Sequence, residues 1–365
     1  MDELEALLAL AHVPHMGSIK IRLLLRHYGS AQNALEADPQ QIAQLPGFYP
    51  QVIAAYIQAM QERHWHRTLD LIQRHNAYVV TFEDPRYPRG LLELSDYPVL
   101  LYVKGDLKPQ DANSIAVIGT RQASIYGKEM AETLARDLVH QGFTIVSGLA
   151  RGIDTHAHQA ALNAKGRTIA VIGSGLADIY PKENEALART IAANGALISE
   201  FPMATPPDRQ NFPQRNRLVA TMTRGTLLIE APEKSGAMIT VSRAVAHKRP
   251  VFAIPGRADS EAFRGNHSVL KNGQAQLVEN ANDVASTFTD LFKPIRLGAA
   301  ITKNEIPLEP EEKSLLQSMP AEELSIDELI DRTKLPVMKL NVLLMSLILK
   351  RMIKEYPGKV FKKVS

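Results

Sequence analysis

Apolar residues recur at helical spacing through the first part of the chain. Leu4 and Leu8 fall on one face of a helix, and comparable patterns continue until strand-like runs replace them. Two glycine-bearing turns, 14–17 and 45–48, separate these stretches. In helix-hairpin-helix modules such turns offer backbone N–H groups to phosphates, whereas elsewhere they simply connect helices. Residues 1–70 are therefore predicted to form a small helical domain, and contact of its turns with nucleic acid stays open.

From residue 75 to about 290, short apolar runs alternate with amphipathic stretches. The predicted strands are Ala77–Thr81, Val99–Val103, Ile115–Gly119, Thr144–Ser147, Thr168–Gly173, Ala196–Ser199, Thr226–Glu230 and Pro250–Ile254. The predicted helices between them are Tyr126–His140, Thr155–Ala164, Glu183–Ala193, Gln214–Thr221 and Ala237–His247. Continuous apolar strands separated by helices indicate βαβ units. We predict an α/β domain, a doubly wound and mostly parallel Rossmann-like sheet with helices on both faces.

The C-terminal part reads as a separate unit. Residues 293–310 contain Pro and Gly without periodicity and are predicted to be a linker. Residues 311–365 contain a capping-box spacing from Ser325 to Glu328, an apolar helix face after Pro336, and two strand-like runs around Pro357-Gly358. Helices followed by a hairpin predict a winged-helix domain.

Composition narrows the possible chemistry. The 365 residues include no Cys, which excludes disulfides, thiolate metal sites and a cysteine nucleophile. The N-terminus lacks a basic stretch and a long apolar run, so we predict a cytoplasmic protein with neither a signal peptide nor a membrane span. Because the net charge is only +3, the local clustering of cations is more informative about partners than the total.

The loops that follow the predicted strands contain glycines, helix starts and cations. In a parallel sheet these loops gather at one edge, where ligands bind. They include Gly119–Arg121, Ser147–Asp154, Gly173–Gly175, Asp208–Arg217 and Glu230–Gly236. Glycine lets a phosphate approach the backbone, helix-terminal N–H groups bind its oxygens, and arginine adds a bidentate donor. Because these loops share glycines, helix starts and cations, they predict a ligand with several phosphates.

Cofactor, metal and catalytic alternatives fit less well. Neither G-x-G-x-x-G nor G-x-x-x-x-G-K-[ST] occurs, so we predict no dinucleotide cofactor and no P-loop. Asp154 and His158 have helical spacing but no third ligand, so no metal site is predicted, and Asp154 is expected to cap its helix. Glu200 and Glu230 are interpreted as acids that orient loop amides or an arginine rather than as a general acid/base pair.

Many short motifs in residues 75–285 occur together in one known family. They are Ile115–Arg121, Ser124–Gly127, Val146–Asp154, Ala157-His158, Thr168–Gly175, Tyr180-Pro181, Ser199-Glu200, Phe212–Arg217, Glu230-Ala231, Ser235-Gly236 and Val251–Gly256. With these motifs the chain resembles the DprA/Smf family, the DNA-processing proteins of natural bacterial transformation. The flanking units agree, because that family often has a sterile-alpha-motif-like domain before this core and a winged helix after it.

The resemblance implies a non-enzymatic protein that binds and protects single-stranded DNA, helps load the RecA recombinase, and forms a homodimer through the Rossmann-like domain. It places phosphate contacts at Arg121, Lys182 and Arg209 and base stacking at Phe212. The predicted DNA-binding residues are Gly119, Thr120, Arg121, Ser147, Gly148, Arg151, Gly152, Lys182, Arg209, Phe212, Arg215, Asn216, Arg217, Ser235 and Gly236. Cations that neutralise phosphates and an aromatic face that accepts any base suit sequence-tolerant binding.

The chain departs from the family pattern at three places. Thr120 stands where serine is common, which keeps the hydroxyl, and Arg209 stands where lysine is frequent, which keeps the charge. Agreement is looser over 265–269, which puts contacts there in doubt.

Two other functions remain open. A nucleoside-monophosphate phosphoribohydrolase has a related core, but its P-G-G-x-G-T-x-x-E loop is replaced by Glu230–Gly236. A winged-helix regulator of duplex DNA is the second, favoured by the basic residues after Lys339. The apolar run Val337–Leu349, however, favours an accessory interaction module over a reader of the major groove.

Overall fold

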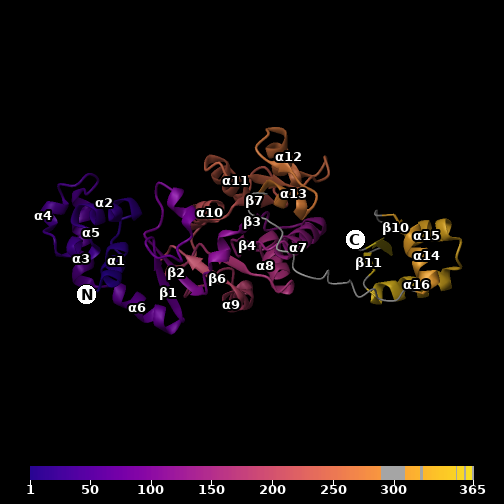
Figure 1. Ribbon diagram of the computed structural model, residues 1–365, viewed down its shortest axis with the longest axis horizontal. Coiled ribbons are helices and arrows are strands. Elements are labelled where there is room, and N and C mark those ends of the chain that lie inside the picture. The colour runs from indigo at the N-terminus through magenta and orange to yellow at the C-terminus, as the bar shows by residue number, and fades with distance from the viewer. Residues whose placement is uncertain (289–308, 321–323, 351, 357–358, 364–365) are drawn as a thin grey trace. The chain divides into compact units, whose positions relative to one another are not determined.

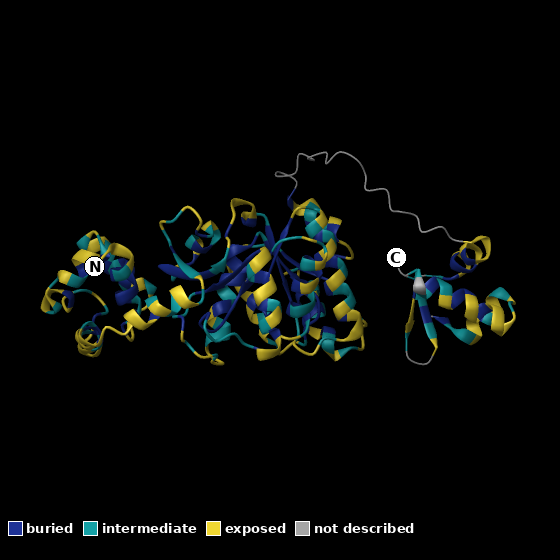
Figure 2. Ribbon diagram, turned by 90° about the horizontal axis from the view of Figure 1, so that it is seen from below, coloured by how far each residue is buried: buried dark blue, intermediate teal, exposed yellow. Residues whose placement is uncertain are grey.

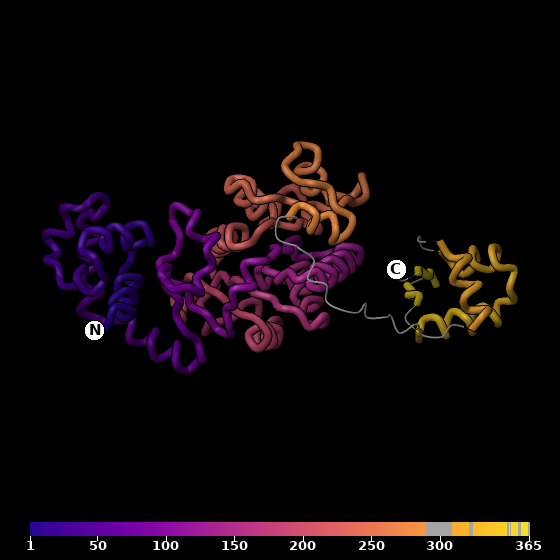
Figure 3. Tube along the Cα trace, viewed as in Figure 1, coloured from indigo at the N-terminus to yellow at the C-terminus, as the bar shows by residue number. Residues whose placement is uncertain are grey.

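The computed structural model describes residues 1–288, 309–320, 324–350, 352–356 and 359–363. It consists of two compact units, Met1–Leu291 and Phe292–Ser365 (Figures 1 and 3). Most of the predicted linker, 293–308, lies outside the described residues. The finer domain limits 1–70, 75–290 and 311–365 stay predictions.

Six helices form the N-terminal part of the first unit. They are α1 (Glu3–Ala11), α2 (Ser18–Tyr28), α3 (Ala31–Glu36), α4 (Pro39–Ile42), α5 (Pro50–Glu62) and α6 (Trp65–Arg74). Their apolar faces enclose the fully buried Trp65, as the periodicity predicts. Arg22 of α2 fastens this part to the sheet domain, because it donates to the Ser95 carbonyl and its guanidinium lies 3.8 Å over the Tyr97 ring.

A nine-stranded sheet forms the centre of the first unit, in the order β1-β2-β6-β5-β4-β3-β7-β8-β9. The strands are β1 (Ala77–Thr81), β2 (Leu100–Gly105), β3 (Ser114–Ile118), β4 (Thr144–Ser147), β5 (Thr168–Val171), β6 (Ala196–Ser199), β7 (Gly225–Leu228), β8 (Val251–Ala253) and β9 (Gln276–Leu277). The strands from β6 to β9 in this order pair in parallel, whereas β2 pairs antiparallel with β1 and with β6. The predicted mostly parallel sheet is confirmed, and β9 is an additional short edge strand.

Helices cover both faces of this sheet (Figure 2). They are α7 (Ile125–His140), α8 (Ile153–Asn163), α9 (Glu185–Asn194), α10 (Asn211–Met222), α11 (Gly236–Ala246), α12 (Arg264–Lys271) and α13 (Ala281–Ala285). Side chains alternate along each strand, so that Ile115 and Val117 pack with α7 and α8 while Ala116 and Ile118 pack with α10 and α11. This two-sided packing confirms the doubly wound architecture.

The second unit is a small helical domain with a three-stranded sheet. Its elements are α14 (Pro310–Ser318), β10 (Leu324–Ser325), α15 (Ile326–Thr333), α16 (Val337–Leu349), β11 (Ile353–Tyr356) and β12 (Val360–Lys363). The predicted capping box forms, because Ser325 Oγ accepts from the Glu328 N–H. Strands β11 and β12 form the predicted antiparallel wing. Met338 and Val342 of α16 are exposed, so the predicted apolar helix presents part of that surface to solvent.

Candidate nucleic-acid interface

The strand order of the sheet reverses between β3 and β7. We call this position, at the carboxyl ends of the two strands, the switch point. Strands β4, β5 and β6 follow β3 on one side, and β7 and β8 lie on the other. We call the loops 119–124, 148–152, 172–181 and 229–235 the carboxyl-edge loops. Ligands of doubly wound sheets bind at such a point, beyond the carboxyl ends of the strands. The structure therefore brings four of the five predicted phosphate-friendly loops to one place, whereas residues 211–217 of the fifth stretch belong to α10.

Glu230 shapes the first of these loops. Its carboxylate is fully buried and accepts hydrogen bonds from the Ser124 N–H (3.0 Å) and hydroxyl (2.7 Å). Ser124 Oγ in turn accepts from the Gly127 N–H at 3.0 Å, which makes it the N-cap of α7. Gly127 is required here, since a Cβ would lie 1.8 Å from Glu230 Oε2. The interpretation of Glu230 as an acid that orients a loop is confirmed.

The second loop is tied to the first. Gly152 has φ +72° and precedes α8, and a Cβ on it would lie 2.4 Å from the Thr120 carbonyl oxygen. The Ile153 N–H donates to that same oxygen at 3.2 Å. Such close packing of backbone on backbone needs glycine. The two loops therefore hold each other in position.

The expectation that Asp154 caps α8 is wrong. The N-cap position is Gly152, and the Asp154 carboxylate lies inside the first turn. It accepts instead from the N–H groups of Gly148 (3.0 Å) and Ala150 (3.3 Å). Because Asp154 is buried, the pKa of its carboxyl is raised by desolvation, although Arg215 opposes this. The Asp154 carboxylate thus holds the second loop against the start of α8.

Arg121 and two aromatic rings line a small hollow among these loops. The exposed Arg121 guanidinium lies 5.1 Å from the centre of the half-buried Phe212 ring. Tyr180 stands 5.9 Å from Phe212 and lines the same hollow, together with Gly148 and Arg151. Sequence reasoning proposed Phe212 but missed Tyr180, whose place beside Pro181 after β5 was the available signal. This cluster combines cations with flat apolar faces at the switch point.

The other exposed cations differ in their partners. Arg151 pairs with Glu183, and Lys182 pairs with Asp178 and Glu185 at 2.9 and 3.1 Å. Arg209 is exposed and makes no hydrogen bond or ion pair within the described residues. Surface ion pairs contribute little stability and exchange readily for another anion. These three side chains are accessible to a ligand at this edge.

Arg215, by contrast, is buried beneath the loops. Its guanidinium donates to the carbonyl oxygens of Gly148 (2.6 Å) and Val171 and lies near the Asp154 carboxylate. Burial lowers the pKa of Arg215 to about 10, so it remains charged at neutral pH. The structure thus gives Arg215 a bracing contact between β5 and the second loop.

The remaining predicted residues are also held by neighbours. Ser147 is buried and donates to the Val117 carbonyl at 2.7 Å, and Asn216 donates to the Gly236 carbonyl at 3.2 Å. Ser235 is the N-cap position of α11, and its hydroxyl is buried without a partner in the described residues. Gly119, Thr120 and Gly236 lie at the edge itself.

Arg217 forms a mostly buried cluster with Glu200 and Asp96. It donates to Glu200, and its Nε lies 3.4 Å from Asp96 Oδ2. The interpretation of Glu200 as an arginine partner is confirmed. Desolvation raises the pKa of Glu200 to about 7, although Arg217 opposes the shift.

This cluster predicts a pH dependence of stability. The folded protein holds the Glu200 proton more tightly than the unfolded chain, whose Glu pKa is near 4.5, so stability should fall as pH rises from about 4.5 to 7. Glu200→Gln removes the charge. Its free energy of unfolding should therefore rise relative to that of wild type by up to about 3 kcal/mol as the pH is raised from 5 to 8. Denaturant unfolding at both pH values measures this. The exposed Glu233→Gln is the matched control, and an equal difference from wild type at both pH values would contradict the assignment.

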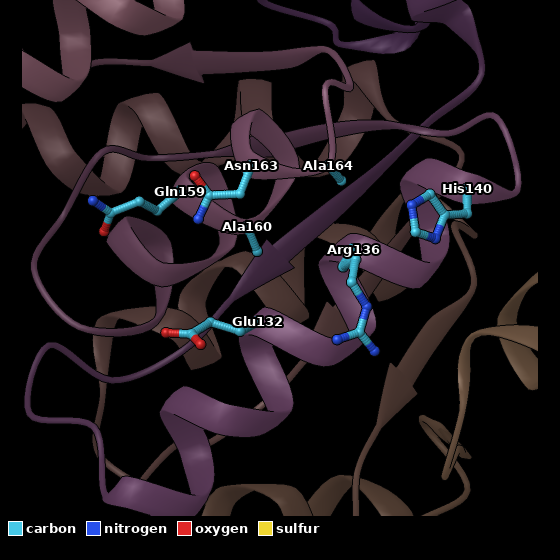
Figure 4. A pocket seen from close by; sticks show the side chains of 7 residues that line it. All are labelled: Glu132, Arg136, His140, Gln159, Ala160, Asn163 and Ala164. Atoms are coloured by element: carbon cyan, nitrogen blue, oxygen red, sulfur yellow. The ribbon is translucent and has the colours of Figure 1, made fainter. Parts of the chain in front are cut away.

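A hollow that is larger than the one beside Arg121 lies between α7 and α8, away from the switch point. It has a volume of about 470 Å³ and is lined by Glu132, Arg136, His140, Gln159, Ala160, Asn163 and Ala164 (Figure 4). Its charges are mixed and no strand ends there. We therefore place the candidate interface at the carboxyl-edge loops.

Among the described residues, His, Asp and Glu side chains do not gather in threes as a metal ion would require. Within the same residues no helix combines the length and apolar character needed to cross a bilayer.

Comparison with known proteins gives consistent matches. Residues 78–289 match the model of the DNA recombination-mediator protein A family, and residues 300–359 match the DprA winged helix domain. Protein Smf of Synechocystis is 31% identical over 96% of both chains. DprA of Streptococcus pneumoniae is 42% identical over 56% of this chain and 72% of its own.

Two solved structures resemble the fold. The X-ray structure of DprA from Streptococcus pneumoniae matches with a TM-score of 0.68 and 34% identity, covering 77% of this chain and 95% of that one. DprA from Helicobacter pylori, reported for its unique single-stranded DNA binding mode, matches with a TM-score of 0.53 and 34% identity, covering 58% of this chain and 96% of that one.

Proposed function

The chain belongs to the DNA recombination-mediator protein A (DprA/Smf) family, and from this we propose that it is a cytosolic protein that binds single-stranded DNA at its carboxyl-edge loops. The observation that carries the proposal is the cluster of the exposed Arg121 with the half-buried rings of Phe212 and Tyr180 at the switch point of the sheet. Arginine neutralises a phosphate while the rings accept any base. The likeness to the Helicobacter pylori protein supports the same substrate.

Binding and protection without catalysis is the proposed activity. The two acids beside the site are committed to structure, Glu230 to Ser124 and Glu200 to Arg217. We further propose that the protein helps load RecA and acts as a homodimer through its Rossmann-like domain. The open edge strand β9, with Leu277 half exposed, is compatible with a protein contact on that domain.

Fluorescence anisotropy with labelled oligo-dT and a matched duplex, across a salt series, tests the proposal. We expect preferential binding of the single strand that weakens steeply with salt. Tighter binding of the duplex would favour the winged-helix regulator instead. Release of a free base from a nucleoside monophosphate would favour the phosphoribohydrolase.

Phe212→Leu tests the stacking part of the proposal. Leucine keeps apolar volume against Gly173 but removes the flat ring, so oligo-dT affinity should fall by about 1–3 kcal/mol. Because no charge is lost, the slope of log affinity against log salt should stay that of wild type. A titration at several salt concentrations measures both quantities. Unchanged affinity would show that bases do not stack on this ring.

A further inference from the structure

A third hollow, of about 500 Å³, lies at the other edge of the sheet. Ile169 is the second residue of β5, Ala112 closes the 3-10 turn that leads to β3, and Arg224 directly precedes β7. The hollow therefore faces the amino ends of the strands, whereas the carboxyl-edge loops follow their other ends. We call it the amino-edge hollow.

Its floor is apolar. Tyr87, Leu107, Ile169 and Met222 are buried residues that line it, and prolines at 85, 88 and 109 surround them. A volume of this size accommodates an apolar side chain with its neighbouring residues. The floor thus offers an anchor point for an apolar group.

Its rim is basic. Five cations stand among the lining residues against two carboxylates: Arg86, Arg89, Lys108, Arg224 and Arg249 against Glu93 and Asp111. Asp111 is already held by two hydrogen bonds from Arg167, at 2.8 and 2.9 Å. Arg89 is exposed and makes no hydrogen bond or ion pair within the described residues. Three of the other rim cations have ion-pair partners: Arg86 with Asp84 (2.7 Å), Lys108 with Asp106 (3.7 Å) and Arg249 with Glu93 (2.7 Å). The side chains of Arg86 and Lys108 are about half exposed, so their partners can be replaced by carboxylates of a ligand.

Three backbone donors around the hollow are already used. The Arg86 N–H donates to Asp84 (2.8 Å), the Lys108 N–H to Asp111 (2.8 Å) and the Arg224 N–H to the Ser114 carbonyl (2.9 Å). This differs from the glycine loops of the carboxyl edge, which suit phosphate. Recognition here falls to guanidinium and ammonium side chains, which pair with carboxylates as well as with phosphates.

Nor does the hollow suit a nucleic-acid base. The Tyr87 hydroxyl donates to the Pro98 carbonyl at 2.8 Å, and the Thr223 hydroxyl donates to the Val219 carbonyl at 3.1 Å. Both polar groups of the floor are therefore occupied, and the buried Tyr87 ring is not open for stacking. An apolar floor below a basic rim favours a peptide over a nucleotide.

We propose that the amino-edge hollow binds an acidic peptide segment of a partner protein, with an apolar side chain of the peptide on the floor and a carboxylate on Arg89. Further carboxylates of the peptide replace Asp84 on Arg86 and Asp106 on Lys108. The site is separate from the proposed DNA interface. The protein can therefore hold single-stranded DNA and an acidic partner at opposite edges of one sheet.

Binding of a labelled peptide of alternating aspartate and leucine to the full chain tests this. Arg89→Glu should weaken that binding about tenfold, because it replaces an attraction by a repulsion. Arg189→Glu reverses an exposed charge on α9, which packs on the other face of the sheet, and should leave peptide binding unchanged. Peptides with asparagine in place of aspartate, or serine in place of leucine, should bind weakly.

Oligo-dT binding by the same variants separates this inference from the proposed function. Arg89→Glu should keep wild-type affinity for oligo-dT. Equal loss of oligo-dT and peptide binding would make the hollow part of the DNA path and overturn the proposal. Absence of peptide binding by wild type, or equal binding of the asparagine or serine peptide, would also overturn it and would leave the DNA interface untouched.

Discussion

Replacing Arg121 by alanine is expected to lower the affinity for oligo-dT by about 2 kcal/mol, roughly thirtyfold. Arg121 is exposed at the switch point, and within the described residues its contact is the Phe212 ring rather than a carboxylate. Its donors are therefore free for phosphate. Loss of one phosphate contact should also make the slope of log affinity against log salt shallower by about 0.7. Anisotropy across a salt series measures both effects.

The matched control for this variant is Arg243→Ala. Arg243 is also exposed but lies in the last turn of α11, away from the carboxyl-edge loops. It should keep the affinity and the salt slope of wild type, and both variants should unfold at the wild-type denaturant midpoint. If Arg121→Ala kept the wild-type affinity for oligo-dT and the wild-type salt slope, the carboxyl edge would be excluded as the DNA site.

Arg215→Met should have a large effect of a different kind, a loss of about 3–5 kcal/mol in the free energy of unfolding. Methionine fills similar space but leaves the carbonyls of Gly148 and Val171 without their donor and Asp154 without its nearby cation. Denaturant unfolding measures the loss. Adding Asp154→Asn should recover part of it, because the buried charge left uncompensated is then gone.

Arg209→Met controls for the loss of a positive charge in the same stretch of sequence. Arg209 is exposed and makes no hydrogen bond or ion pair within the described part of the chain, so its replacement should not change stability. If Arg215→Met instead kept the wild-type midpoint and lost oligo-dT binding, Arg215 would belong to the DNA surface.

Arg209 and Arg215 lie close together in sequence, but the sequence does not show that one is exposed and the other buried. The alternation of apolar runs and helices predicted the doubly wound sheet, because that signal is local. Whether Arg215 faces solvent or the core depends on how α10 packs on the sheet, which no local pattern contains. The helix also begins at Asn211 rather than Gln214, since a proline is tolerated in the first turn.

Strand β9 and the role of Asp154 were missed for similar reasons. Two residues are too few for a period to be recognised, and β9 exists because Phe252 and Ala253 of β8 pair with it. Asp154 has the residue type and position of a cap, but its carboxylate turns back to the loop N–H groups. Tertiary contacts decided both outcomes.

The hydrogen bonds between Ser124 and Glu230 determine when during synthesis the first carboxyl-edge loop takes its shape. The two residues are 106 positions apart in sequence, so the first loop cannot acquire its shape until β7 has docked beside β3. A chain still on the ribosome, with β3 to β6 made but Glu230 not yet emerged, lacks the acceptor that holds this loop. The proposed DNA interface therefore forms late in synthesis, when the two halves of the sheet join.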